Sequence, residues 1–295
     1  MRFNPKASIG SGQVSGSRGG GGRMPMPSGM AAGGGGLAII AVILLFLVQQ
    51  CAGVNIPVMP GGPDGNSQAG DETAYEHCLT GDDANKDEDC ARKAVALSLE
   101  AFWASESSVS NFRVAPIVTF SGQVSTACGQ ASSAVGPFYC PGDLTIYLDP
   151  TFFDQVLEGQ LGGKGGDFVE PYVLGHEYGH HIQRLTGQME NVRTQQGPDS
   201  DAVKLELQAD CYAGLWARAA ESTEDGSGVA IFSEIDDADI QEALSAAYTV
   251  GDDHIQEVTG GRVDTGSWTH GSSQQRMEWF KRGFESGNFS ACDIW

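Results

Sequence analysis

The stretch that decides the fold is YVLGHEYGHHIQ at residues 172–183. His176 and His180 are four residues apart, so on a helix their side chains project from one face, about 6 Å apart along the axis, a separation that one metal ion can bridge. Glu177 follows the first histidine and would lie beside a metal-bound water rather than on the metal. This H-E-x-x-H pattern predicts a zinc site, although a histidine pair on a core helix can also be a hydrogen-bonded packing feature.

A third ligand is expected on a separate helix. Residues 201–218, DAVKLELQADCYAGLWAR, place Glu206 and Asp210 four residues apart on one face of a mostly apolar helix. On a solvated face two carboxylates need no partners, but buried unpaired carboxylates cost several kcal/mol. We therefore expect Glu206 to bind the metal and Asp210 to accept the second ring N–H of a ligand histidine.

Two further motifs follow this pair of helices in the chain. The chain contains H-E-Y-G-H-H-I-Q, then E-L-Q-A-D-C-Y-A-G-L-W-A, then T-H-G-S-S-Q-Q-R and a final S-A-C-D. Over about residues 72–295 this order resembles the bacterial neutral zinc metallopeptidase family, single-pass membrane proteins with an outward zincin-like domain. More distantly, E-x-x-A-D and T-H-x-S-x-x-x-R resemble the gluzincin integral-membrane peptidases of the CAAX-processing type. The resemblance implies that His176, His180 and Glu206 bind Zn²⁺ and that Glu177 is the general base. It implies no particular substrate.

The chemistry expected of such a site is hydrolytic. Zinc with two imidazoles and one carboxylate keeps an open position, where a bound water falls in pKa towards about 7. Glu177 would take the water's proton and pass it to the leaving amine. The developing oxyanion needs a second donor, for which His270 is the candidate, with Tyr178 and His254 behind it. Alternatively, His270 belongs to a helix start that a following serine caps. His181 points about 100° away from the second ligand and is expected to be structural.

The N-terminal part of the chain has a different composition. Residues 1–36 are rich in glycine and hold four basic residues and no acid, and residues 37–48 are an unbroken apolar run. We predict a transmembrane anchor over 37–58, with a cleaved signal peptide as the alternative. The positive-inside rule then keeps the basic segment in the cytoplasm and the C-terminal domain outside the cytoplasmic membrane. Residues 59–71 are expected to be a linker, and 72–295 the domain.

Charge and cysteine content limit the partners that the protein can bind and the compartment in which it folds. The chain of 295 residues has 17 Lys+Arg and 38 Asp+Glu, a formal charge of −21, which excludes a nucleic-acid partner. Six of the seven cysteines lie in the acidic part, with fifteen formal pairings. No C-x-x-C is present, which disfavours a zinc ribbon, and disulfides indicate an oxidising compartment. Spacing suggests two local loops and one remaining pair: Cys78 with Cys90, Cys128 with Cys140, and Cys211 with Cys292. His77, among acids, is expected at the surface.

Hydrophobic periodicity predicts the remaining elements. A helix begins near Asp87, and strands follow at 114–122 and 144–149, the second half-buried. Later patterns are helical. Their ranges are 150–161, 168–186, 201–221, 233–248 and 272–286. Strands before helices indicate an α+β domain, mainly helical with a small sheet.

Together these observations predict a membrane-anchored zinc endopeptidase that hydrolyses proteins or peptides outside the cytoplasmic membrane. The open edge of strand 144–149 could pair with an extended substrate. The alternative is a non-catalytic, zinc-stabilised interaction module. A metal-dependent amidase of cell-wall peptides ranks third, because no wall-binding repeat is visible.

Overall fold

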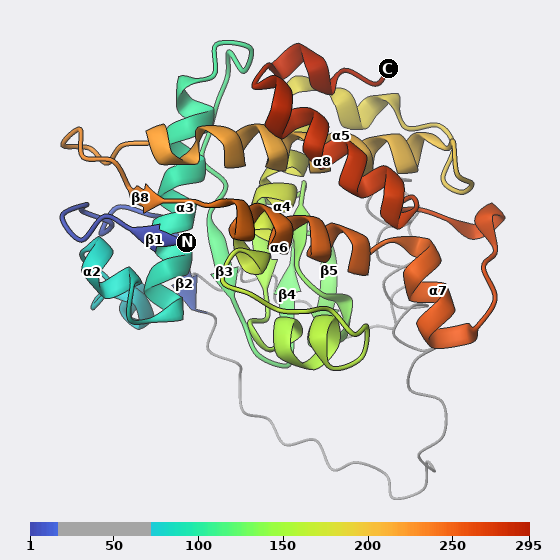
Figure 1. Cartoon of the computed structure of the whole chain (residues 1–295), viewed down its shortest axis with the longest axis horizontal. Helices are drawn as coiled ribbons and strands as arrows, with labels where there is room; N and C mark the ends of the chain where they lie inside the picture. The colour runs from blue at the N-terminus through green and yellow to red at the C-terminus, as the bar shows by residue number, and fades with distance from the viewer. Residues whose placement is uncertain (17–71) are drawn as a thin grey trace, which may run out of the picture.

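The computed structural model of the protein describes residues 1–16 and 72–295, of which far more lie in helices than in strands (Figure 1). Side-chain caps fix several helix starts: Asp87, Ser200 and Ser272 each accept hydrogen bonds from backbone N–H groups of the first turn. The predicted helices are confirmed with two changes: 150–161 forms a short π-helix, η3 (Phe153–Glu158), and the range predicted at 233–248 begins in a strand, so that its helix starts only at Asp237. The α-helices are α2 (Gly81–Ala84), α3 (Glu88–Ser105), α4 (Val169–Thr186), α5 (Asp201–Ala219), α6 (Asp237–Thr249), α7 (Asp252–Gly260) and α8 (Ser273–Ser286).

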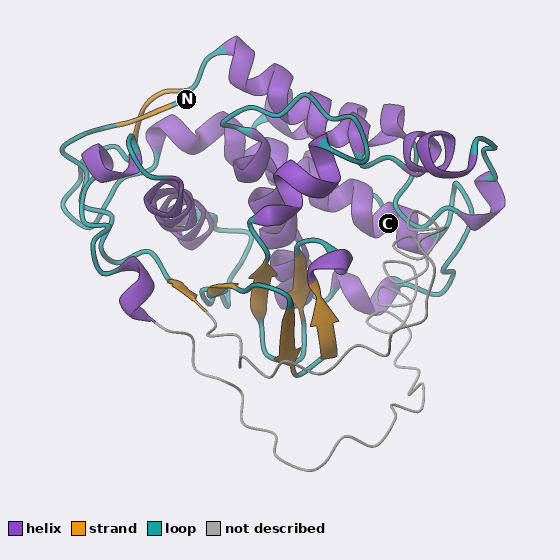
Figure 2. Cartoon of the chain, turned by 90° about the horizontal axis from the view of Figure 1, so that it is seen from below, coloured by secondary structure: helices purple, strands orange, loops and turns teal. Residues whose placement is uncertain are grey.

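A small sheet lies on one side of the helices (Figure 2). Its strand order is β2-β3-β7-β6, in which β2, β3 and β7 run parallel and β6 is the antiparallel edge. Two smaller pairs complete the strands, β1 with β8 and the hairpin β4–β5. The bounds are β1 (Arg2–Phe3), β2 (Val14–Gly16), β3 (Ile117–Thr119), β4 (Gln123–Thr126), β5 (Gly129–Ser132), β6 (Phe138–Cys140), β7 (Thr145–Leu148) and β8 (Phe232–Glu234). The mixed architecture confirms the α+β class.

Strand β7 is more buried than its alternating sequence predicts. All four of its residues are buried, because β3 and β6 flank it and each face is covered. Ile146 packs into the main core, whereas Tyr147 packs with Val124 and Ala131 of the hairpin. The strand predicted at 144–149 is confirmed as β7, but the prediction that it is half-buried and has an open edge is wrong, and the sheet edge next to α4 is β6.

The first sixteen residues belong to the same fold. β2 pairs with β3, the Asn4 N–H donates to the Ile231 carbonyl at 2.9 Å, and Ile9 is fully buried. The prediction that residues 1–36 form a segment separate from the domain is therefore wrong for residues 1–16, which complete the sheet of the C-terminal domain.

This arrangement constrains the predicted membrane topology. The anchor at 37–58 and the linker at 59–71 lie outside the described residues. Within the described ranges, the structure contains no helix with the length and apolar character that a membrane span requires. Residues 1–16 and the domain share one sheet, so they lie on the same side of any membrane. A single crossing between them would separate them, and the predicted orientation does not fit these contacts.

Three disulfides fasten the fold, in the pairs suggested by spacing. Cys78 bonds Cys90, Cys128 bonds Cys140, and Cys211 of α5 bonds Cys292 near the C-terminus. Each link stabilises by about 2–4 kcal/mol, chiefly by restricting the unfolded chain.

Small residues let α4 and α5 approach closely. A Cβ at Gly179 of α4 would lie 3.0 Å from the Ala209 backbone of α5, and one at Gly175 would lie 3.3 Å from the Ala213 side chain. The four positions form two i, i+4 pairs that face each other across the helices. This contact brings the carboxylates of α5 within reach of the histidines of α4.

A second close contact joins α5 and α8. Gly283 of α8 faces the Cys211 carbonyl and Gly214 of α5 faces the Phe280 carbonyl, with no room for a side chain at either glycine. The contact holds Arg276 of α8 against α5, where its positive charge lies beside the buried carboxylate of Asp210.

Candidate metal centre

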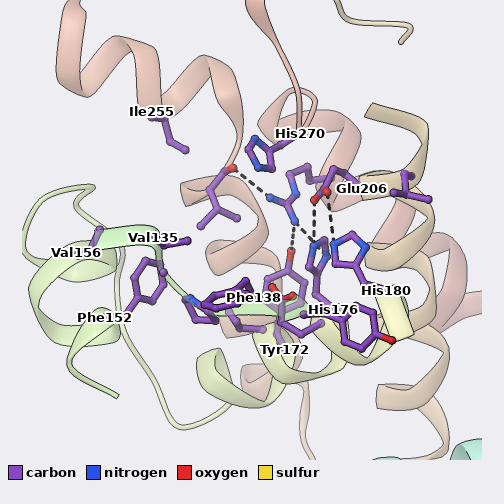
Figure 3. Close-up of a pocket in the computed structure, with 18 of the residues that line it drawn as sticks. Val135, Phe138, Phe152, Val156, Tyr172, His176, His180, Glu206, Ile255 and His270 are labelled. Carbon is purple, nitrogen blue, oxygen red and sulfur yellow. Dashed lines mark hydrogen bonds and ion pairs between the residues drawn. The ribbon is translucent and has the colours of Figure 1, made fainter. Parts of the chain in front are cut away.

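The three predicted ligands converge at the interface of α4 and α5 (Figure 3). Nε2 of His176 lies 3.2 Å from one Glu206 carboxylate oxygen, and Nε2 of His180 lies 3.4 Å from the other. Tetrahedral zinc with ligands at about 2.0–2.1 Å separates its ligand atoms by about 3.3 Å. The two imidazoles and one carboxylate thus fit zinc in both chemistry and spacing.

Asp210 lies behind the first ligand, where the sequence placed it. Its Oδ1 accepts from Nδ1–H of His176 at 2.8 Å, which directs Nε2 of that ring to Glu206. Burial alone would raise the pKa of Asp210, but the charges of Arg276 and His176 hold it at about 2. Asp210 is therefore a carboxylate that fixes the tautomer and orientation of a ligand.

Arg276 and Tyr172 share this carboxylate, and the sequence assigned neither a role. The Arg276 guanidinium donates from Nε at 2.8 Å and from Nη2 at 3.0 Å, and the Tyr172 hydroxyl donates at 2.6 Å. Arg276 closes the T-H-G-S-S-Q-Q-R motif, and that position was the available signal. These donors neutralise the buried charge and lock its position.

Gln183 performs the corresponding task for the second ligand. Its Oε1 accepts from Nδ1–H of His180 at 2.9 Å, while its Nε2 donates to the Leu205 carbonyl and to Gln208 of α5. The sequence analysis missed this residue, although it lies three positions after His180 on the same helix face. Each ligand imidazole therefore has a fixed hydrogen-bond acceptor behind it.

Glu177 is buried beside the ligands and is held from the sheet side. The backbone N–H of Tyr139 in edge strand β6 donates to its carboxyl group. Burial raises the pKa of Glu177, although the two neighbouring histidines and this hydrogen bond oppose the rise. A carboxyl group with a raised pKa beside a metal centre is suited to take up and release a proton.

His270 lines the same pocket from the loop before α8 (Figure 3). Its Nδ1 lies 3.2 Å from Asp252, which also accepts the backbone N–H groups of Thr269, His270 and Gly271. Burial alone would lower the pKa of His270, but Asp252 raises it. No local sequence pattern indicates Asp252, because its role depends on how the 269–271 loop folds back on α7.

The other histidines and Tyr178 lie elsewhere. Tyr178 accepts from the Ala115 backbone N–H, and His254 contacts the Leu161 carbonyl. Neither of these two alternative candidates for the oxyanion donor lines the pocket. His181 is structural, as expected: its Nε2–H donates to the Arg113 carbonyl, and burial lowers its pKa to about 4. His77 has a half-exposed side chain, as predicted.

The sequence as a whole is similar to proteins of one family. A family model described as "Putative neutral zinc metallopeptidase" matches residues 5–295, so the chain belongs to this family and Zn²⁺ is the cofactor that the family implies. The match includes most of the N-terminal segment that the fold unites with the domain.

Individual relatives match a smaller part of the chain. The uncharacterized protein Rv2575 of Mycobacterium tuberculosis is 48% identical over 220 residues, 73% of each chain. The uncharacterized protein YpfJ of Escherichia coli K12 is 43% identical over 183 residues, 60% of each chain. No solved structure matches.

Proposed function

We propose that the protein is a gluzincin-like zinc endopeptidase that hydrolyses proteins or peptides outside the cytoplasmic membrane. The observation that carries this proposal is the position of Glu177, a buried carboxyl group beside three converging ligand atoms at an open pocket. The family supports a zinc peptidase, and the zincin-like fold, the gluzincin ligand set and the location are parts of the proposal.

Each residue around the centre has its own role in the proposed hydrolysis. Bound Zn²⁺ would acidify a water and polarise the substrate carbonyl. His176, His180 and Glu206 would hold it, oriented by Asp210 and Gln183. Glu177, positioned by the Tyr139 N–H, would accept the water's proton and deliver it to the leaving amine.

His270 would stabilise the negative charge that develops on the attacked carbonyl oxygen. Asp252 holds Nδ1, which leaves Nε2–H as the donor for the pocket. A fixed donor aimed at a developing oxyanion contributes about 3–4 kcal/mol in enzymes where one has been removed. His270 is thus proposed as the second catalytic residue.

The substrate backbone is proposed to run beside β6 rather than beside the strand predicted from sequence. β6 is the sheet edge next to α4, and Tyr139 of β6 contacts Glu177 directly. A peptide extended along this edge would place its scissile bond over the metal centre.

The non-catalytic alternative explains less of the site. A module that used zinc only to hold α4 and α5 together would need neither a carboxyl group at Glu177 nor a pocket open beside the ligands. An amidase of cell-wall peptides would use the same residues, and no feature of the described residues favours it.

The three disulfides support action in an oxidising compartment. Membrane attachment through 37–58 stays in the proposal only as attachment without a complete crossing, because residues 1–16 pair with the sheet of the domain that holds the metal centre.

The test is the Glu177→Gln variant. We expect one zinc per chain in both wild type and variant, with hydrolysis of an unfolded casein-type substrate reduced by about 10²–10⁴-fold in the variant. Glu190→Gln, an exposed change just after α4, is the matched control and should keep full activity. Undiminished hydrolysis by Glu177→Gln would refute the proposed base, and a folded wild type that binds no zinc would refute the centre.

A further inference from the structure

The pocket extends well beyond the metal centre, and its far part is apolar. The cavity measures about 160 Å³. Figure 3 shows Val135, Phe152 and Val156 grouped at the end away from His180 and Glu206, with Phe138 between this group and His176. The apolar residues on its walls come from separate elements: Val135, Phe138, Phe152, Val156, Leu161, Val250 and Ile255.

The charged side chains that line the cavity lie at its other end, around the metal centre. Among the described residues that line the cavity, the ionisable side chains are those of the metal centre and its neighbours, together with the Tyr139 and Tyr172 phenols. A charged substrate side chain placed at the apolar end would lose its hydration without gaining a partner. An apolar side chain placed there would gain by leaving water, in proportion to its area.

A glycine with positive φ shapes the backbone at the apolar end of the cavity. Gly136 has φ 81°, and a Cβ there would lie 3.0 Å from the Phe152 ring. The glycine therefore permits both the turn and the close approach of that ring. Val156 lies in the π-helix η3, and single π-turns occur frequently at functional sites.

We propose that this end of the cavity is a specificity pocket, which receives the substrate side chain next to the scissile bond and selects a large apolar residue such as leucine, methionine or phenylalanine. The inference rests on the proposed function and specifies its substrate class. Val156 and Ile255, partly exposed wall residues from η3 and α7, are the positions that set the preference.

Peptides of one sequence provide the first test, with Leu, Phe, Ala, Asp or Lys placed in turn on each side of the cleaved bond. We expect kcat/KM for Leu or Phe to exceed that for Ala by at least about tenfold on one side, and to exceed that for Asp or Lys by more. Equal rates for all five residues on both sides would overturn the proposal.

Variants of two wall residues, one in α7 and one in η3, test which positions set the side-chain preference. Ile255→Lys should reduce cleavage of Leu peptides by at least about tenfold and raise the relative rate for Asp peptides. Val258→Lys on the same helix, at an exposed position outside the cavity lining, should leave the preference unchanged. Val156→Phe should shift the preference from Phe towards Ala without adding a charge. Identical preferences in wild type, Ile255→Lys and Val156→Phe would refute the assignment.

Binding separates this inference from the proposed hydrolysis. Zinc-loaded Glu177→Gln should bind Leu peptides more tightly than Asp peptides by about tenfold in fluorescence anisotropy, without cutting either. If wild type cuts nothing yet this preference appears, the pocket stands and the peptidase proposal fails. If wild type cuts peptides and binding shows no preference, the peptidase stands and the pocket fails.

Discussion

Replacing Asp210 by Asn tests whether the metal centre depends on a buried charge behind its first ligand. Asp210 is fully buried and accepts from His176, Arg276 and Tyr172 at 2.6–3.0 Å. Asparagine has nearly the same shape but no charge, and its NH₂ group would face a donor. The change therefore removes the counter-charge of Arg276 and weakens the hold on His176.

The structure sets the size of both effects. The pKa of Asp210 is about 2, against 3.8 ordinarily, so the site favours the carboxylate by about 2–3 kcal/mol. Losing one partner of a buried ion pair costs about 3–5 kcal/mol, because the other charge stays buried. Losing the acceptor behind a ligand histidine lowers metal affinity by about 10–100-fold. We expect the variant to fold less stably and to bind zinc in that weaker range.

Zinc competition with a chelating dye measures the affinity, and urea unfolding in chelator measures the metal-free stability. Asp252→Asn is the matched control, because Asp252 is also a buried carboxylate but supports His270 instead of a ligand. This control should keep its zinc affinity while hydrolysis falls. A zinc affinity for Asp210→Asn within about twofold of wild type would refute the role assigned to Asp210.

Three other predictions concern stability. Burial raises the pKa of Glu100 to about 7, and its carboxyl group accepts the Gln13 N–H. The folded state therefore holds a proton that the unfolded state releases near pH 4.5. Because of this difference, the free energy of unfolding should fall by about 3 kcal/mol between pH 4.5 and 7. Glu100→Gln should abolish that fall, and an unchanged pH profile in denaturant unfolding would contradict it. Ile9→Ala should cost about 2–5 kcal/mol, since Ile9 is fully buried; a loss under 0.5 kcal/mol would show that the N-terminal segment does not pack on the domain. Replacing Cys211 and Cys292 by Ala should lower the melting temperature and speed zinc loss to a chelator, and zinc release at the wild-type rate would separate this disulfide from the metal centre.

The convergence of the candidate ligands could be predicted from sequence because helical periodicity carries the relevant geometry. His176 and His180, like Glu206 and Asp210, are i, i+4 pairs, so each pair must share a helix face wherever its helix lies. Long apolar helices are also the elements that sequence patterns define best. The pairing of Asp210 with His176 followed from the cost of burying a carboxylate without a partner.

The parts that sequence could not supply depend on contacts between distant segments. β2 and β6 have three residues each, too few for alternation to be visible. The order of strands in the sheet is set by long-range pairing, so β7 was expected at an edge that β6 occupies. Asp252 supports His270 only because a loop returns to the first turn of α7, which no local pattern records.

The sheet pairing of the N-terminal segment has a consequence for how the protein is made. Val14 pairs with Ile117, so about a hundred residues separate the first sheet strand from its neighbour. The ribosome releases β2 long before β3 exists, and β2 cannot dock until the intervening chain has been delivered to the same compartment. During synthesis this short strand therefore stays without its partner, and the sheet can close only when the chain has been made at least as far as β3.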